Sequence, residues 1–120
     1  MLSLKFATVP VADQARALAW YTDKLGCSVI EDVPFGSQRW IELAFPAGGS
    51  HIVLFTAPGD ESRVGTFVGL SFTADDIEQV YEVLCRRGVV FSRPLEPADW
   101  GGKQAIFQDS EGNQFVLAAR

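Results

Sequence analysis

The sequence contains one short unit written twice, and this internal repeat constrains the fold more than any single residue does. Each copy opens on a β-rich stretch, continues with an aspartate before a helix pattern, and reaches a glycine where that pattern stops. Asp13 and Gly26 mark the helix of the first copy, and Asp75 and Gly88 stand at the same spacing in the second. A repeat of this kind has to be interpreted first, because it dictates the architecture.

The repeat predicts an α+β fold built from two tandem βαβββ modules. The two copies also end on similar apolar stretches, at residues 51–54 and 114–117. We place module 1 at about residues 1–57, a polar linker at about 58–65 and module 2 at about 66–120, all in a single domain. Neither module can bury its apolar faces alone. We therefore expect modules to pack together into a curved, cup-like mixed sheet with the helices on its outer face.

The helix limits follow from local signals. Asp13 is expected to cap the first helix and Gly26 to end it. Asp75 is expected to cap the second helix, with Glu78 completing a capping-box-like pair, and Gly88 to end it. Residues 34–37 are predicted to form a turn. The strands are expected at residues 4–11, 27–33, 38–45, 51–55, 66–73, 89–92, 104–108 and 114–119.

The composition is that of a core-forming chain, and its charge excludes several partners. A net charge of −5 lacks the basic face that binding to nucleic acid or to an anionic membrane requires. No apolar run approaches the roughly 20 residues needed to span a bilayer, and the first residues do not resemble a signal peptide. Cys27 and Cys85 suggest neither a disulfide framework nor a metal motif. We therefore expect a cytoplasmic protein with reduced thiols.

Several short motifs support a resemblance over essentially the whole chain. They are Val11-x-Asp13, Ala17, Trp20-Tyr21, Leu25-Gly26, Trp100-Gly101 and the stretch DSEGNQFVL at 109–117. With them the sequence resembles the vicinal oxygen chelate superfamily, which includes glyoxalase I, bleomycin-resistance proteins and extradiol dioxygenases. The resemblance implies paired βαβββ modules forming a cup that a second subunit usually completes, and hence a homodimer. It does not specify the function, because this fold hosts lyases, isomerases, dioxygenases and drug binders.

The resemblance also implies a test for a metal ion. Enzymes of this superfamily bind a divalent metal through His and Glu side chains on the first and last strand of each module. Those positions fall here near Phe6 and Gly69 and at Val53 and Val116, none of which can ligate a metal. The chain also has only one histidine. We therefore expect no metal cofactor, although a displaced site built from His51, Glu42 and a symmetry mate stays open.

Without metal ligands, the cup is expected to be an aromatic pocket with a few polar groups. Aromatic faces attract planar or cationic molecules, and the Glu42 carboxylate would favour a positive charge. We expect a protein that sequesters such a small molecule, as in the bleomycin-resistance branch, without a cofactor. The candidate ligand-binding residues are Phe6, Trp40, Glu42, His51, Phe55, Trp100 and Gln108.

Two other functions stay open. The first is an enzyme, a lyase or isomerase of glyoxalase type, that uses a displaced metal site or Glu42 as a general base. The second is a structural or regulatory module whose cup is filled by its own side chains or by a partner. Trp100 is expected to act either as a lid or as an anchor for its loop. Whether modules pair within one chain or between two chains is also open.

Overall fold

The structure, a computed structural model, describes residues 1–119. The chain forms two compact units, Met1–Val64 (unit 1) and Gly65–Arg120 (unit 2), and each is described by itself. Each unit contains one four-stranded sheet and one α-helix in the order βαβββ. The predicted α+β fold with two βαβββ modules is therefore confirmed. Within residues 1–119, neither helix is long and apolar enough to cross a membrane.

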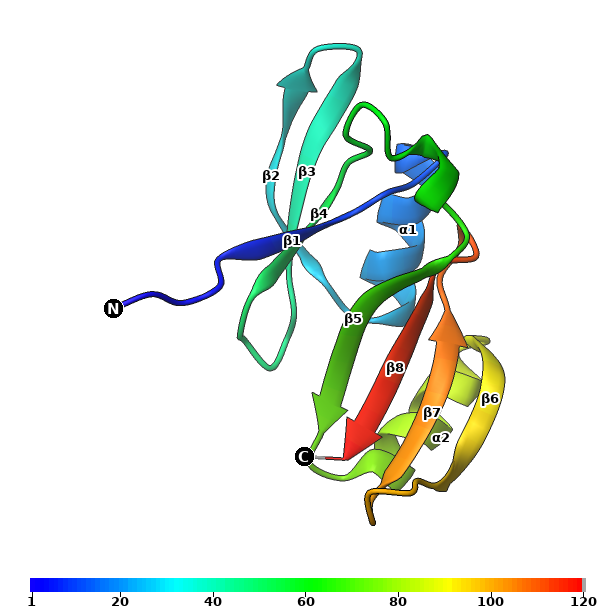
Figure 1. Cartoon of the computed structure of the whole chain (residues 1–120). Coiled ribbons are helices and arrows are strands. Elements are labelled where there is room, and N and C mark those ends of the chain that lie inside the picture. Colours follow the sequence, from blue (N-terminus) through cyan, green and yellow to red (C-terminus); the bar gives the residue numbers. More distant parts are fainter. Residues whose placement is uncertain (120) are drawn as a thin grey trace. The chain divides into compact units, whose positions relative to one another are not determined.

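Unit 1 is a mixed sheet with α1 on one of its faces (Figure 1). The strand order is β1-β4-β3-β2, in which β1 runs parallel to β4 and the other neighbours are antiparallel. A short 3₁₀ turn, η1, follows the sheet. The elements are β1 (Phe6–Val9), α1 (Gln14–Lys24), β2 (Ser28–Phe35), β3 (Gln38–Ala44), β4 (His51–Leu54) and η1 (Glu61–Arg63).

Alternation along β3 and β4 separates the two faces of the unit 1 sheet. Ile41 and Leu43 on β3 and Leu54 on β4 are completely buried, as are Ala17 and Tyr21 on α1. These side chains form the core between sheet and helix, because residues two apart on a strand share a face. The intervening residues of β3 and β4 face away from α1. We call this second side the open face of unit 1.

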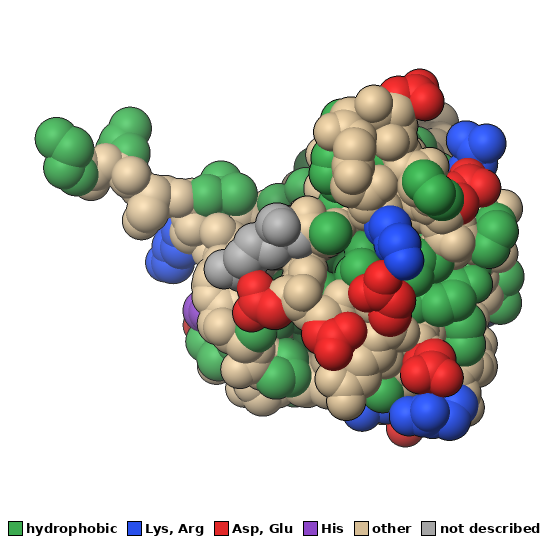
Figure 2. All heavy atoms as spheres, turned by 90° about the horizontal axis from the view of Figure 1, so that it is seen from below, with side chains coloured by type: hydrophobic (Ala, Val, Ile, Leu, Met, Phe, Trp, Pro, Cys, Tyr) green, Lys and Arg blue, Asp and Glu red, His purple; other side chains and the backbone are tan. Residues whose placement is uncertain are grey.

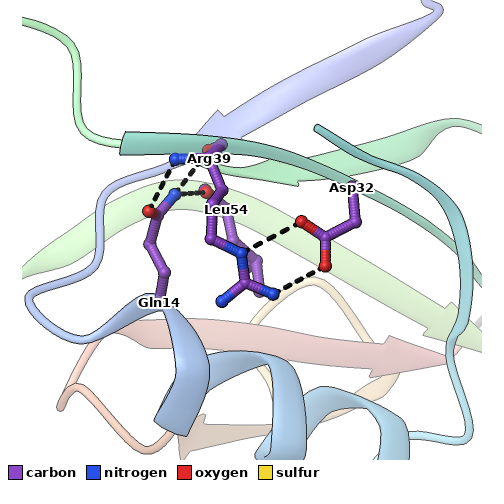
Figure 3. A network of polar contacts seen from close by, with 4 residues as sticks. All are labelled: Gln14, Asp32, Arg39 and Leu54. Atoms are coloured by element: carbon purple, nitrogen blue, oxygen red, sulfur yellow. Dashed lines mark hydrogen bonds and ion pairs between the residues drawn. The ribbon is translucent and has the colours of Figure 1, made fainter. Parts of the chain in front are cut away.

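The first turn of α1 is fixed to the sheet by specific hydrogen bonds. The Asp13 carboxylate accepts from the Arg16 N–H at 3.0 Å, so the predicted N-cap is confirmed. The Gln14 amide donates to the carbonyl oxygens of Arg39 and Leu54 and accepts from the Arg39 N–H at 2.9 Å (Figure 3). The Arg39 guanidinium makes a two-pronged ion pair with Asp32 on β2. These contacts set the position of α1 against β3 and β4.

Unit 2 repeats this plan with a different core. Its strand order is β5-β8-β7-β6, with β5 parallel to β8. Phe107 and Phe115 are buried and lie on the face covered by α2, whose Tyr81 ring contacts Phe91 at 4.6 Å between centroids. The elements are β5 (Phe67–Ala74), α2 (Ile77–Arg86), β6 (Val90–Pro97), β7 (Lys103–Gln108) and β8 (Gln114–Ala119).

The predicted cap of α2 is wrong by one residue. Asp76, and not Asp75, accepts from the Gln79 N–H at 3.1 Å, because the helix begins at Ile77 and the cap stands directly before it. The predicted capping-box role of Glu78 is also wrong. Its carboxylate pairs with the Lys103 ammonium on β7 at 2.6 Å.

Two strands are longer than predicted. The turn expected at 34–37 is confined to Gly36 and Ser37, because β2 continues through Phe35 and pairs it with Gln38. Strand β6 likewise extends beyond the predicted end at residue 92, to Pro97. Both strands lie at a sheet edge, where a proline is tolerated because one side of the strand has no hydrogen-bonded neighbour. The first strand is shorter than predicted and covers only Phe6–Val9.

Candidate functional site

Four aromatic rings gather on the open face of unit 1. Phe6, Trp40 and Phe55 come from β1, β3 and the residue after β4, and Phe35 comes from the end of β2. Trp40 lies between the others, with centroid distances of 5.4 Å to Phe6, 5.5 Å to Phe35 and 5.6 Å to Phe55. We call these four residues the aromatic cluster. Phe35 remains 54% exposed, so the cluster presents a ring surface that the fold does not cover.

A hydrogen-bonded acid and base lie beside the aromatic cluster. The Glu42 carboxylate and the His51 Nδ1 are 2.6 Å apart, on the neighbouring strands β3 and β4. The Glu42 side chain is 8% exposed and the His51 side chain 30%. In the pairing of β1 with β4, His51 lies beside Phe6, and the Phe6 ring contacts Trp40. The pair is therefore the polar part of the same face.

The hydrogen bonds to Glu42 keep its carboxylate ionised. The hydrogen bond from His51 is the largest influence and lowers the pKa of Glu42 below its ordinary value, while burial opposes it. A hydrogen bond from the Trp40 side chain and the nearby charge of Lys5 act in the same direction as His51. A buried carboxylate without a partner would have a raised pKa. Glu42 instead has hydrogen-bond partners, and its pKa is lowered.

The lowered pKa of Glu42 predicts an acid-sensitive contribution to stability. A carboxyl whose pKa is lower in the folded state stabilises the fold above its ordinary pKa of 4.5, and that contribution is lost as the pH falls below it. Glu42→Gln should cost about 1 kcal/mol near neutral pH and should show a smaller loss of stability on acidification than the native chain. Urea unfolding at a series of pH values measures this. Glu31→Gln, an exposed residue opposite Glu42 on β2, is the control; an equal acid dependence for native chain and Glu42→Gln would contradict the prediction.

The two remaining candidate residues lie in unit 2. Gln108 is on β7, opposite Gln114 on β8, on the face away from the buried Phe107 and Phe115. Trp100 is 59% exposed in the loop between β6 and β7, and its ring lies so close to Gly102 that a Cβ there would meet it at 1.9 Å. Its indole N–H also reaches the Gln104 side chain at 3.5 Å. Within unit 2, Trp100 therefore packs against its own loop.

Within the described part of the chain, the donor groups beside the aromatic cluster are too few to hold a metal ion. Among residues 1–119, no three side chains of His, Cys, Asp or Glu lie close enough together to hold a metal ion. Glu42 and His51 supply only two donor groups, which are already bonded to each other. The positions that the family resemblance assigns to ligands hold apolar or missing side chains. These are Phe6, Val53, Gly69 and Val116.

Unit 1 also contains an open depression of about 520 Å³ next to the 36–37 hairpin and η1. Its polar side chains largely bond to neighbouring backbone. Gln38 donates to the Thr56 carbonyl at 2.7 Å, and Thr56 accepts from the Val11 N–H at 2.9 Å. These groups hold the chain after β4 against β3 and the end of β1. The walls of the depression are therefore held in place by these hydrogen bonds.

Sequence reasoning missed one member of the aromatic cluster, Phe35. We expected a turn at 34–37, so this side chain was not considered for the site. The available signal was the alternation of Val33 and Phe35, which continues the period of two from the strand. Pro34, which lies between them, belongs to the predicted turn, although an edge strand tolerates proline.

Comparison with known proteins identifies the family. The sequence model of the Glyoxalase/Bleomycin resistance protein/Dioxygenase superfamily matches residues 3–117. The chain belongs to this superfamily, as its paired βαβββ modules and sequence motifs indicated. Among known sequences, it is 33% identical to the uncharacterized protein YurT of Bacillus subtilis (strain 168), over 99% of this chain and 100% of that protein.

Two solved structures are similar to this chain along nearly their whole length. A member from Sphaerobacter thermophilus DSM 20745 has a TM-score of 0.88 and 30% sequence identity, and the match covers 100% of this chain and 98% of that one. TnmS3, an antibiotic binding protein from Streptomyces sp. CB03234, has a TM-score of 0.80 and 28% identity, covering 99% of this chain and 96% of that one.

Proposed function

We propose that this protein binds a planar or cationic small molecule against the aromatic cluster and sequesters it without a metal ion. The observation that carries the proposal is the gathering of four rings, with Trp40 at their centre, on a sheet face that α1 does not cover. Planar molecules stack on such rings, and cations are attracted to their faces. The similarity to TnmS3, an antibiotic binding protein, supports the same class of function.

The charge of the site is compatible with a cationic ligand. The lowered pKa of Glu42 leaves one negative charge behind the aromatic cluster near neutral pH. The same property argues against Glu42 as the general base of a lyase or isomerase, because a catalytic base works best with a pKa near the operating pH. Sequestration therefore accounts for the arrangement better than Glu42-dependent catalysis does.

The proposal includes a homodimer in the cytoplasm. Edge strand β2 carries Val29, Ile30 and Val33, which are 40–54% exposed and would be covered by a second copy. Figure 2 shows the N-terminal end as a narrow projection with hydrophobic side chains uncovered.

The proposed compartment agrees with the state of the cysteines. Both cysteines are free, and burial raises the pKa of Cys27 to about 12, so this thiol is unreactive.

Native mass spectrometry of protein purified without chelators tests these statements together. We expect a dimer of metal-free mass that gains 7-methoxycoumarin, a neutral planar probe, or ethidium, a cationic planar probe. Dialysis against a chelator should change neither the mass nor the amount of bound probe. Stoichiometric divalent metal in the dimer would overturn the metal-free proposal, and absence of adducts with both probes would overturn the binding proposal.

A further inference from the structure

The tautomer of His51 is determined by its partner. Glu42 is buried and ionised near neutral pH, and an ionised carboxylate can only accept hydrogen bonds. At a separation of 2.6 Å, the proton between the two groups therefore lies on the His51 Nδ1. In the neutral imidazole the other ring nitrogen, Nε2, is then an acceptor without a hydrogen.

His51 is the more accessible member of the pair. Its side chain is 30% exposed, whereas that of Glu42 is only 8% exposed. A molecule stacked on the aromatic cluster next to Phe6 would thus meet the imidazole first. The other charged groups around the pair are Lys5, just before β1, and Glu31, opposite Glu42 on β2.

We infer that the His51 Nε2 is the polar contact of this site, and that it takes the proton of a weakly acidic hydroxyl on a planar aromatic ligand. In this step the ligand O–H bond breaks, an N–H bond forms at Nε2, and the electron pair stays on the ligand oxygen. The product is a phenolate beside an imidazolium that still donates to the Glu42 carboxylate. A carboxylate that orients a histidine also stabilises its protonated form. The inference rests on the proposed function, since it names the ligand class of the same site.

The direct test uses the fact that the chain has one histidine. Protein labelled with ¹⁵N in histidine gives a single pair of ring nitrogen signals, both from His51. At a pH where the imidazole is neutral, we expect the spectrum to show a protonated Nδ1 and an unprotonated Nε2. A proton on Nε2 with a bare Nδ1 would overturn the inference without any ligand or variant.

The second test measures the proton transfer. The probe is 7-hydroxycoumarin, whose neutral and phenolate forms absorb at different wavelengths, and 7-methoxycoumarin is the matched probe without a hydroxyl. Bound 7-hydroxycoumarin should ionise about one pH unit lower than the free probe, a tenfold change in its acidity. His51→Phe keeps a ring at this position and should abolish the shift, which is measured on 7-hydroxycoumarin at saturating protein. Glu42→Gln should reduce the shift.

The outcomes separate this inference from the function on which it rests. If both probes bind and the ionisation of 7-hydroxycoumarin is the same as in free solution, the inference fails and the proposed function stands. An unchanged shift in His51→Phe would also overturn it. If ethidium binds the native protein and neither coumarin does, the inference fails and the proposed function stands. If none of the three probes binds, both fail.

Discussion

Replacing Trp40 with alanine should weaken the binding of 7-methoxycoumarin by about ten- to a hundredfold. Trp40 contacts each of the other three rings, so its removal takes away the largest stacking surface and the packing that positions its neighbours. A planar ligand loses about 1–3 kcal/mol when an aromatic side chain under it is truncated to alanine. Titration followed by the fluorescence of the probe, with circular dichroism to check the fold, measures the effect.

Two matched variants sharpen this result. Trp40→Phe keeps a ring in the aromatic cluster and should lose only a small part of the affinity. Trp20→Phe changes a tryptophan on α1 whose ring contacts Tyr21, so its binding should equal that of the native chain. An affinity that survives in Trp40→Ala would move the ligand away from the aromatic cluster.

Replacing Asn113 with alanine should destabilise the protein by about 2–4 kcal/mol. The Asn113 side chain is completely buried and bridges two parts of unit 2. Its Oδ1 accepts from the Gly65 N–H at 2.8 Å, and its Nδ2 donates to the Asp109 carboxylate at 3.0 Å. Asp109 also accepts from the backbone N–H groups of Glu111 and Asn113. Alanine would remove one donor from this buried charge and the acceptor of the Gly65 N–H.

The variant Asn113→Asp gives this prediction a distinctive pH dependence. It retains an acceptor for the Gly65 N–H but places a second carboxylate 3.0 Å from the Asp109 oxygen. The two charges repel near neutral pH, whereas a single shared proton at lower pH restores a hydrogen bond. Relative to Asn113→Ala, this variant should therefore gain stability on acidification in urea unfolding. Native-like stability in both variants would show that the network contributes little.

The sequence alone predicted the elements whose limits depend on local chemistry. The Asp13 cap, the glycines that end the two helices and the alternating strands are all set by contacts within a few residues. Gly26 and Gly88 have positive φ of 72° and 86°, which explains why glycine stands at both helix ends. The repeat then predicted two βαβββ modules, because copies of one pattern adopt the same local structure.

The errors occurred where a local signal had two physical interpretations. A proline next to a turn sequence predicted that β2 would stop, and only the position of β2 at the sheet edge allows it to continue to Phe35. Two adjacent aspartates precede α2, and Asp75 was the wrong choice of cap. The helix begins at Ile77, a buried residue, and this start selects Asp76 as the cap.

The candidate site was also predicted in part from the sequence and decided in part by the tertiary structure. Alternation in the sequence predicted that Trp40, Glu42 and His51 would share a face, because side chains on a strand alternate with a period of two. Only the tertiary structure decided that Glu42 and His51 meet at 2.6 Å, since this distance depends on the register between β3 and β4. That contact lowers the pKa of Glu42 and engages the Nδ1 of His51, and no pattern within a single strand contains this information.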